Sequence, residues 1–140
     1  MTSPGHVVSE FLNGVTDWAR HQPTLSGIAL VGSHARGEAR PDSDIDLVLL
    51  FTPPNAFLDN ISWAQLFGEV AACQTEEWRR VTSLRGSYRN GLEVELGMTT
   101  PAWARFPIDA GTRQVVSNGM RILLDKEGTL GRLLEAVLGV

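Results

Sequence analysis

Residues 31–47 read VGSHARGEARPDSDIDL and lie between two apolar runs, LSGIAL at 25–30 and VLLFT at 48–52. Each run has the length and composition of a buried strand. The segment between them is too polar and too rich in glycine to be a strand, so we expect a loop with a short helical turn. It also brings two aspartates to the edge of the core, where negative charge is costly unless a cation binds it.

Asp44 and Asp46 begin the second strand, where residues i and i+2 point to one face about 6.5–7 Å apart. Two converging carboxylates repel each other unless a divalent cation lies between them, and Mg²⁺ prefers such oxygen ligands together with phosphate. A simple turn with a helix cap remains the alternative for this pair taken alone. An EF-hand calcium loop is excluded, because Leu47 and Pro53 occupy the positions of its glycine and its glutamate.

Gly32 and Ser33 directly follow the first strand. Glycine lets the backbone approach a ligand closely, and a helical turn that starts at Ser33 presents N–H groups to an anion. The Ser33 hydroxyl and the Arg36 guanidinium are further donors that suit phosphate. The segment is neither a Walker A loop, since no Gly-Lys-Ser/Thr ends it, nor a Gly-x-Gly-x-x-Gly dinucleotide loop.

A second acidic pair, Glu93 and Glu95, shares one face of a strand predicted at 92–96, just after the hairpin signal Asn90-Gly91. Many surface strands show the same pattern. If this strand lies beside the one that begins at Ile45, one glutamate reaches the aspartates. Three carboxylates could then hold two metal ions about 3.5–4 Å apart, and the third could also act as general base.

The whole sequence predicts an α/β (α+β) domain with a small mixed β-sheet packed by helices. Cys73 falls in a predicted helix, where we expect a buried free thiol. The expected helices cover 5–22, 60–77, 112–119 and 128–139, and the expected strands cover 25–33, 45–52, 78–88, 92–98 and 120–125.

Length and composition narrow the class of protein. With 140 residues, we expect one domain over 1–140. The net charge of −4 argues against a general nucleic-acid binder, and the four tryptophans are expected in the core or an interface rather than stacked on bases. Neither a signal peptide nor a membrane-spanning run is seen, so a cytoplasmic protein without a membrane partner is expected.

The blocks GSHARG at 32–37 and SDIDL at 43–47, followed by an acid at Glu93 or Glu95, resemble the DNA polymerase β-like nucleotidyltransferase superfamily. The first two blocks have its order and spacing, whereas the third is looser. The sequence is most similar to the minimal nucleotidyltransferase group, and the similarity spans roughly residues 7–95.

The resemblance implies a nucleotidyltransferase fold and an enzyme that moves a nucleoside monophosphate, AMP being favoured, from a nucleoside triphosphate to a hydroxyl acceptor. Pyrophosphate is released, and Mg²⁺ is the cofactor, as two ions. The implied catalytic and metal-binding residues are Asp44, Asp46 and Glu95, the latter chosen over Glu93 because Gly97 follows it. The implied nucleotide-binding residues are Gly32, Ser33, Arg36, Asp44 and Asp46. His34 is expected to be a solvated loop residue.

The larger members of the superfamily have an added helical domain for the acceptor, and nothing comparable follows Glu95 here. The acceptor is then held by the tail, by a second copy in a homo-oligomer, or by another protein. In the minimal group the partner is often a small helical HEPN protein, in a toxin–antitoxin pair. An aminoglycoside-like small molecule is another acceptor. A non-catalytic module that neutralises a partner by contact, and a nucleotide sensor, are the competing functions.

Overall fold

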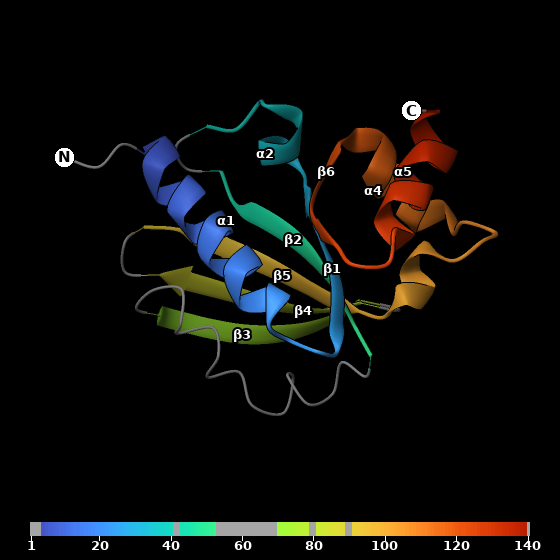
Figure 1. Cartoon of the computed structure of the whole chain (residues 1–140). Helices are drawn as coiled ribbons and strands as arrows, with labels where there is room; N and C mark the ends of the chain where they lie inside the picture. The colour runs from blue at the N-terminus through green and yellow to red at the C-terminus, as the bar shows by residue number, and fades with distance from the viewer. Residues whose placement is uncertain (1–3, 41–42, 53–69, 79–80, 89–90, 140) are drawn as a thin grey trace.

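The computed structural model describes residues 4–40, 43–52, 70–78, 81–88 and 91–139. Helices lie on both faces of a sheet (Figure 1), which confirms the predicted α/β fold class. The elements in chain order are α1 (Pro4–Arg20), β1 (Leu25–Val31), α2 (Ser33–Arg36), β2 (Ile45–Phe51), β3 (Val70–Trp78), β4 (Val81–Tyr88), β5 (Glu93–Thr99), the 3-10 helix η2 (Pro101–Ala104), α4 (Ala110–Asn118), β6 (Met120–Asp125) and α5 (Thr129–Leu138).

The strands of the described chain form one six-stranded sheet in the order β3-β4-β5-β2-β1-β6. The central pair, β5 and β2, is parallel, and every other neighbouring pair is antiparallel. The sheet is therefore mixed, as predicted. Because β2 and β5 run in the same direction, their first residues meet at the same edge of the sheet.

One face of the sheet packs against α1. Odd-numbered residues of β2, such as Ile45 and Leu47, point to this face and are buried with Phe11 and Val15 of the helix. The even-numbered Val94 and Leu96 of β5 join the same cluster. The alternation expected for a strand that begins with Asp-Ile-Asp-Leu is thus observed, with the apolar residues on the side of α1.

The opposite face of the sheet is apolar over one half and polar over the other. Val48 and Leu50 of β2 are buried there beneath η2, α4 and α5, in a second apolar cluster with Trp103 and Leu130. The alternation of β2 therefore places Asp46 on this same face, next to Val48. The site lies where the apolar half of the face ends and polar side chains of β2, β4 and β5 begin.

The helix predicted at 60–77 is wrong over the part that the structure describes, because Val70–Trp78 is the strand β3. It pairs antiparallel with β4 along its whole length. Tertiary pairing with an available strand edge outweighs the local apolar spacing that favoured a helix. Cys73 accordingly lies in a strand, opposite Gly86, and not in a helix. Residues 60–69 lie outside the described residues.

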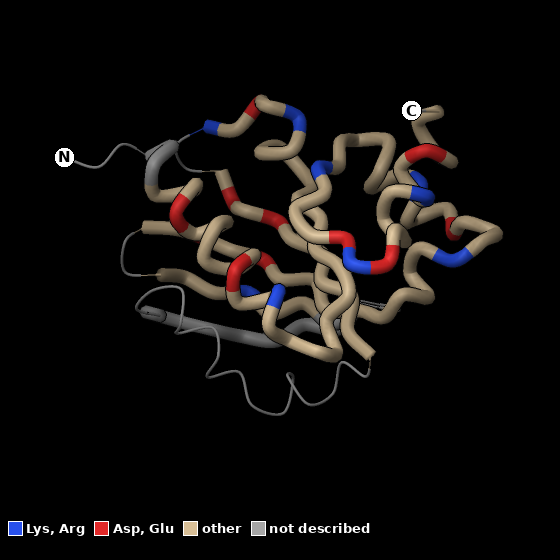
Figure 2. Tube along the Cα trace, in the orientation of Figure 1, with Lys and Arg blue, Asp and Glu red and all other residues tan. Residues whose placement is uncertain are grey.

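The other predicted elements are confirmed within a few residues at their ends, including the helical turn in the loop after β1. No described helix is long and apolar enough to cross a membrane. The single domain over 1–140 stays a prediction. Lys and Arg are interspersed with Asp and Glu along the described chain and do not gather on one element (Figure 2).

Two leucines of α5 test whether this helix closes the second face. Leu130 is 0% exposed and Leu138 is 47% exposed. We expect Leu130→Ala to lower the free energy of unfolding by about 2–5 kcal/mol through a cavity, and Leu138→Ala, the matched control, by less than about 1 kcal/mol. Urea denaturation measures both. Equal losses would contradict the packing described here.

Candidate active site

The parallel pairing of β2 and β5 brings two carboxylates together. Asp46 is the direct register partner of Glu95, as Ile45 is of Val94. Both acids point away from α1, because their neighbours Ile45, Leu47, Val94 and Leu96 are buried on the side of that helix. The condition under which a glutamate would reach the aspartates is therefore met.

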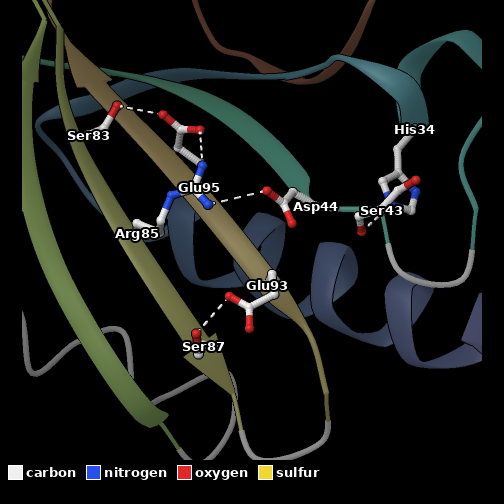
Figure 3. Close-up of polar contacts among 8 residues, drawn as sticks. All are labelled: His34, Ser43, Asp44, Ser83, Arg85, Ser87, Glu93 and Glu95. Carbon is white, nitrogen blue, oxygen red and sulfur yellow. Dashed lines mark hydrogen bonds and ion pairs between the residues drawn. The ribbon is translucent and has the colours of Figure 1, made fainter.

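Asp44 lies just before β2 and is linked to Glu95 through the guanidinium of Arg85. Arg85 of β4 lies opposite Glu95, and its guanidinium spans both acids (Figure 3). One guanidinium nitrogen of Arg85 lies 3.4 Å from Oδ2 of Asp44, and the other lies 3.3 Å from Oε2 of Glu95. The Ser83 hydroxyl donates to the other oxygen, Oε1 of Glu95, at 3.1 Å.

Glu93 and Glu95, the two candidates for the third carboxylate, lie in different surroundings. The exposed Glu93 is the first residue of β5. It accepts a hydrogen bond of 2.7 Å from the Ser87 hydroxyl, away from Asp44 (Figure 3). Glu95 is the one that lies beside Asp46. Gly97, which suggested Glu95 from the sequence, lines the same pocket as these two acids.

Gly32 allows the turn after β1 to pass close to Asp46. Its φ of 78° and ψ of −155° are rarely accessible to other residues. A Cβ atom at this position would lie only 2.6 Å from Oδ2 of Asp46. The short helix α2 begins at the next residue, Ser33, so the Gly-Ser turn lies against Asp46.

Arg36 ends α2 and also lines the pocket. Its guanidinium contacts Glu38 at 3.3 Å and donates to the carbonyl oxygen of Asn118 at 3.4 Å. Gly119, with φ of 129°, leaves room for this side chain, since a Cβ there would lie 2.7 Å from Cγ of Arg36. The C-terminal part of the chain thus helps to place Arg36.

His34 differs from its expected role as a solvated residue. It is half-buried, and its Nε2 lies within hydrogen-bond distance of the Ser43 carbonyl oxygen at 3.3 Å. Nε2 is then the donor, because a carbonyl oxygen only accepts. The contact links the two ends of the loop that leads to Asp44 (Figure 3).

A pocket of about 330 Å³ opens over this group of residues. Its lining is partly polar and partly apolar, as that of a small-molecule site usually is. Its polar lining consists of Arg36, Asp46, Ser83, Glu95 and Asn118. Its apolar lining includes Val31, Val48, Trp103 and Val115.

Sequence reasoning missed Ser83, Arg85 and Asn118, and it expected Trp103 in the core or an interface rather than at the site. Trp103 is indeed 7% exposed, but it also walls the pocket. A signal for Arg85 was present, since a hairpin turn at Asn90-Gly91 places Arg85 opposite or next to Glu95. Asn118 and Trp103 depend on how the C-terminal elements fold back, and no local pattern indicates that.

Asp46 has a perturbed acidity. Its pKa is raised from 3.8 to about 6, first by burial and then by the negative charges of Glu95 and Asp44, while Arg85 and His34 act in the opposite direction. A raised pKa means that the folded chain disfavours the ionised carboxylate. A cation beside Asp46 would remove that penalty.

The group of acids suits a divalent cation in its chemistry, although its side chains are now arranged around Arg85. Among the described residues, no three His, Cys, Asp or Glu side chains are already arranged to hold a metal ion. Asp44, Asp46 and Glu95 nevertheless supply hard oxygen ligands on adjoining backbone positions. The close approach at Gly32 and the raised pKa of Asp46 both fit a cation at this place.

The pKa of Asp46 gives a stability prediction for metal-free protein. Because the folded pKa exceeds the unfolded one, stability falls as pH rises from about 4 to about 6, and the whole cost is present above pH 6. We expect Asp46→Asn in EDTA to raise the free energy of unfolding at pH 7.5 by about 1 kcal/mol after allowance for solvent screening.

Denaturation at pH 4 and pH 7.5 measures this effect, and the gain should vanish at the lower pH. Asp44→Asn is the matched control. It removes an acid that pairs with Arg85, so no gain is expected. A wild type that is at least as stable as Asp46→Asn at pH 7.5 would contradict the assignment.

Gly32 gives a second prediction. Gly32→Ala should lower the free energy of unfolding by about 1–3 kcal/mol, because the new methyl group meets the Asp46 carboxylate in a strained backbone conformation. Gly37→Ala is the control, since Gly37 also has a positive φ of 73° but nothing within 4 Å of its Cβ position. About 1 kcal/mol is expected there. Equal effects in thermal melts would count against the crowding at Gly32.

Comparison with known proteins agrees with this geometry. Residues 15–77 match the family model described as the nucleotidyltransferase domain. No curated protein sequence matches the chain significantly. Among solved structures, an aminoglycoside 6-adenyltransferase from Bacillus subtilis superposes with a TM-score of 0.57 and 16% identity. The superposition covers 86% of this chain and 40% of the other.

Two further structures are more distant. The GLD-2/RNP-8 complex gives a TM-score of 0.49 at 19% identity, over 79% of this chain and 43% of the other. A toxin–antitoxin structure with AMP-PNP gives a TM-score of 0.47 at 15% identity, over 91% of this chain and 84% of the other.

The superposition on the adenyltransferase supports the fold, and this chain spans less than half of that protein's length. The family match covers the unit of β1, α2 and β2 that positions Gly32, Asp44 and Asp46. The sequence blocks, the mixed sheet and the matched region agree, and we conclude that residues 15–77 of this chain are similar to the nucleotidyltransferase domain.

Proposed function

We propose that this chain is a Mg²⁺-dependent nucleotidyltransferase that moves a nucleoside monophosphate, AMP being favoured, from a nucleoside triphosphate to a hydroxyl acceptor. The observation that supports it most is the register of β2 and β5, which sets Asp46 beside Glu95 at the edge of a pocket. Asp44 adjoins them through Arg85. Carboxylates on neighbouring strands are what a metal-assisted phosphoryl transfer requires.

Asp44, Asp46 and Glu95 would hold the Mg²⁺, as two ions. The ions supply positive charge against the triphosphate and lower the pKa of the incoming hydroxyl. Gly32 and Ser33 hold the β- and γ-phosphates through backbone N–H groups and the Ser33 hydroxyl. The position of the Gly-Ser turn against Asp46 supports this role.

In the reaction, the acceptor oxygen attacks the α-phosphorus of the nucleotide. A new P–O bond forms, the bond from the α-phosphorus to the bridging oxygen breaks, and pyrophosphate leaves with the electron pair. Glu95 accepts the proton of the attacking hydroxyl as general base. The Ser83 hydroxyl donates to Oε1 of Glu95 and helps to fix the orientation of this carboxylate.

The pocket would hold the base and the sugar of the nucleotide. Its volume of about 330 Å³ is at the lower end of small-molecule sites. Trp103, Val115 and Val48 form an apolar wall suited to a base or sugar ring, and Arg36 and Asn118 add polar groups beside it. Arg36 can bind a phosphate group if its guanidinium releases its exposed partner Glu38.

The acceptor is an open part of the proposal. A small polyhydroxyl molecule is one candidate, and a small helical HEPN-type protein, as partner in a toxin–antitoxin pair, is the other. The resemblance of the GSHARG and SDIDL blocks to the minimal group favours the protein partner. A cytoplasmic location and a homo-oligomer that completes the acceptor site belong to the same proposal.

Label transfer tests the function. The chain is incubated with each α-labelled nucleoside triphosphate, Mg²⁺ and an extract of its own source. We expect one labelled acceptor, with ATP as the best donor, and at least a 100-fold slower transfer by Asp44→Asn/Asp46→Asn, since both carboxylates contribute to charge stabilisation in the transition state.

Asp17→Asn is the control. Asp17 is an exposed acid of α1, on the other side of the sheet, and its variant should transfer at the wild-type rate. Unchanged transfer by the double variant would exclude this site. If wild type transfers no label but captures a protein from the extract, the chain acts instead as a contact module that neutralises its partner.

A further inference from the structure

Arg85 occupies the centre of the acidic group. It extends from β4, opposite Glu95 in the antiparallel register, and its fork reaches acids from two different parts of the chain. The separations are 3.4 Å to Asp44 and 3.3 Å to Glu95 (Figure 3). Neither the family blocks nor the reaction described above requires a cation from β4. The arginine therefore needs its own explanation.

We propose that Arg85 is a displaceable internal cation, which ties Asp44 to Glu95 in the metal-free chain and must release them before a divalent cation binds. This inference rests on the proposed function only for the place of the metal. Arg85 is then a positioning residue. It sets the cation concentration at which the three carboxylates become available.

The contacts of Glu95 support a competition. Its Oε1 accepts from the Ser83 hydroxyl and its Oε2 faces the Arg85 guanidinium. Each carboxylate oxygen therefore already has one donor, and a cation that binds the remaining lone pairs of Glu95 must approach close to the Arg85 guanidinium. Arg85 is the donor whose positive charge also opposes a metal ion, since like charges in a partly buried site repel.

The strength of the contacts makes release feasible. The side chains of Arg85, Asp44 and Glu95 are 41%, 38% and 30% exposed, so solvent screens both pairs. Separations of 3.3–3.4 Å are longer than the usual 2.7–2.9 Å of a charge-assisted hydrogen bond. Partly exposed pairs of this kind contribute little each, and a divalent cation with several oxygen ligands can replace them.

A pre-arranging role for Arg85 predicts the opposite change in cation affinity when this arginine is replaced. If Arg85 merely pre-arranges the acids for a metal, its loss leaves them repelling one another and weakens cation binding. If Arg85 competes, its loss strengthens cation binding while the metal-free chain becomes less stable. The sign of the change in cation affinity separates the two.

The test measures Mn²⁺ binding to the full chain by electron paramagnetic resonance, without nucleotide. Arg85→Gln should bind Mn²⁺ about three- to tenfold more tightly than wild type, the change expected when one or two screened ion pairs stop competing. Arg85→Lys keeps the charge but cannot bridge two acids in a fork, so its affinity should lie between the two. Arg113→Gln removes the same charge from an exposed position of α4 and should bind as wild type does.

Thermal melts provide an independent measurement. In EDTA, Arg85→Gln should melt below wild type, and saturating Mn²⁺ should raise its melting temperature by more than it raises that of wild type. Arg85→Lys should recover most of the stability in EDTA. If Arg85→Gln does not fold, the side-chain N–H resonances of Arg85 in wild type replace it. They should shift on addition of Mg²⁺, whereas those of Arg113 should not.

Two outcomes would overturn the proposal. They are equal or weaker Mn²⁺ binding by Arg85→Gln, and side-chain resonances of Arg85 that do not shift when Mg²⁺ is added. None of these measurements uses a nucleotide or an acceptor. Tighter binding by Arg85→Gln in a chain that transfers no label would support the competition and contradict the transferase, so the two failures are distinguishable.

Discussion

The parallel contact between β2 and β5 is the constraint on which the site depends. It sets Asp46 directly beside Glu95 although 49 positions separate them in the sequence, since 95 − 46 = 49. A parallel pair requires a long connection, and here β3 and β4 lie within it. The connection thereby places β4 against the free edge of β5, and with it Ser83 and Arg85 beside the acids.

The face of the sheet opposite α1 explains why the pocket has both polar and apolar lining residues. Every second residue of β2 faces it, first as aspartate and then as Val48 and Leu50. The helices α4 and α5 cover the apolar part. Asp46 lies at the edge of this part, partly buried by its apolar neighbours, which is the first cause of its raised pKa. The strand β2 therefore supplies both Asp46 and part of the apolar support beside it.

Much of this could be predicted from the sequence, because the deciding signals are local. Gly-Ser after one apolar run and Asp-x-Asp before the next placed Gly32, Asp44 and Asp46, and strand alternation gave the face of each. Residues 70–77 could not be predicted correctly, since apolar spacing favoured a helix and only the edge of β4 makes them a strand. Trp103 and Asn118 depend on how the C-terminal elements fold back, which no short pattern encodes, whereas the hairpin turn at Asn90-Gly91 could have placed Arg85 beside Glu95.

The central claim is that Asp44, Asp46 and Glu95 bind a nucleoside triphosphate through a divalent cation. The most direct measurement is a titration of the chain with a non-hydrolysable ATP analogue by isothermal calorimetry, in Mg²⁺ and in EDTA. The account predicts binding in Mg²⁺ that is lost in EDTA and in Asp46→Asn. Equal affinity in Mg²⁺ and in EDTA, or full affinity in Asp46→Asn, would contradict it.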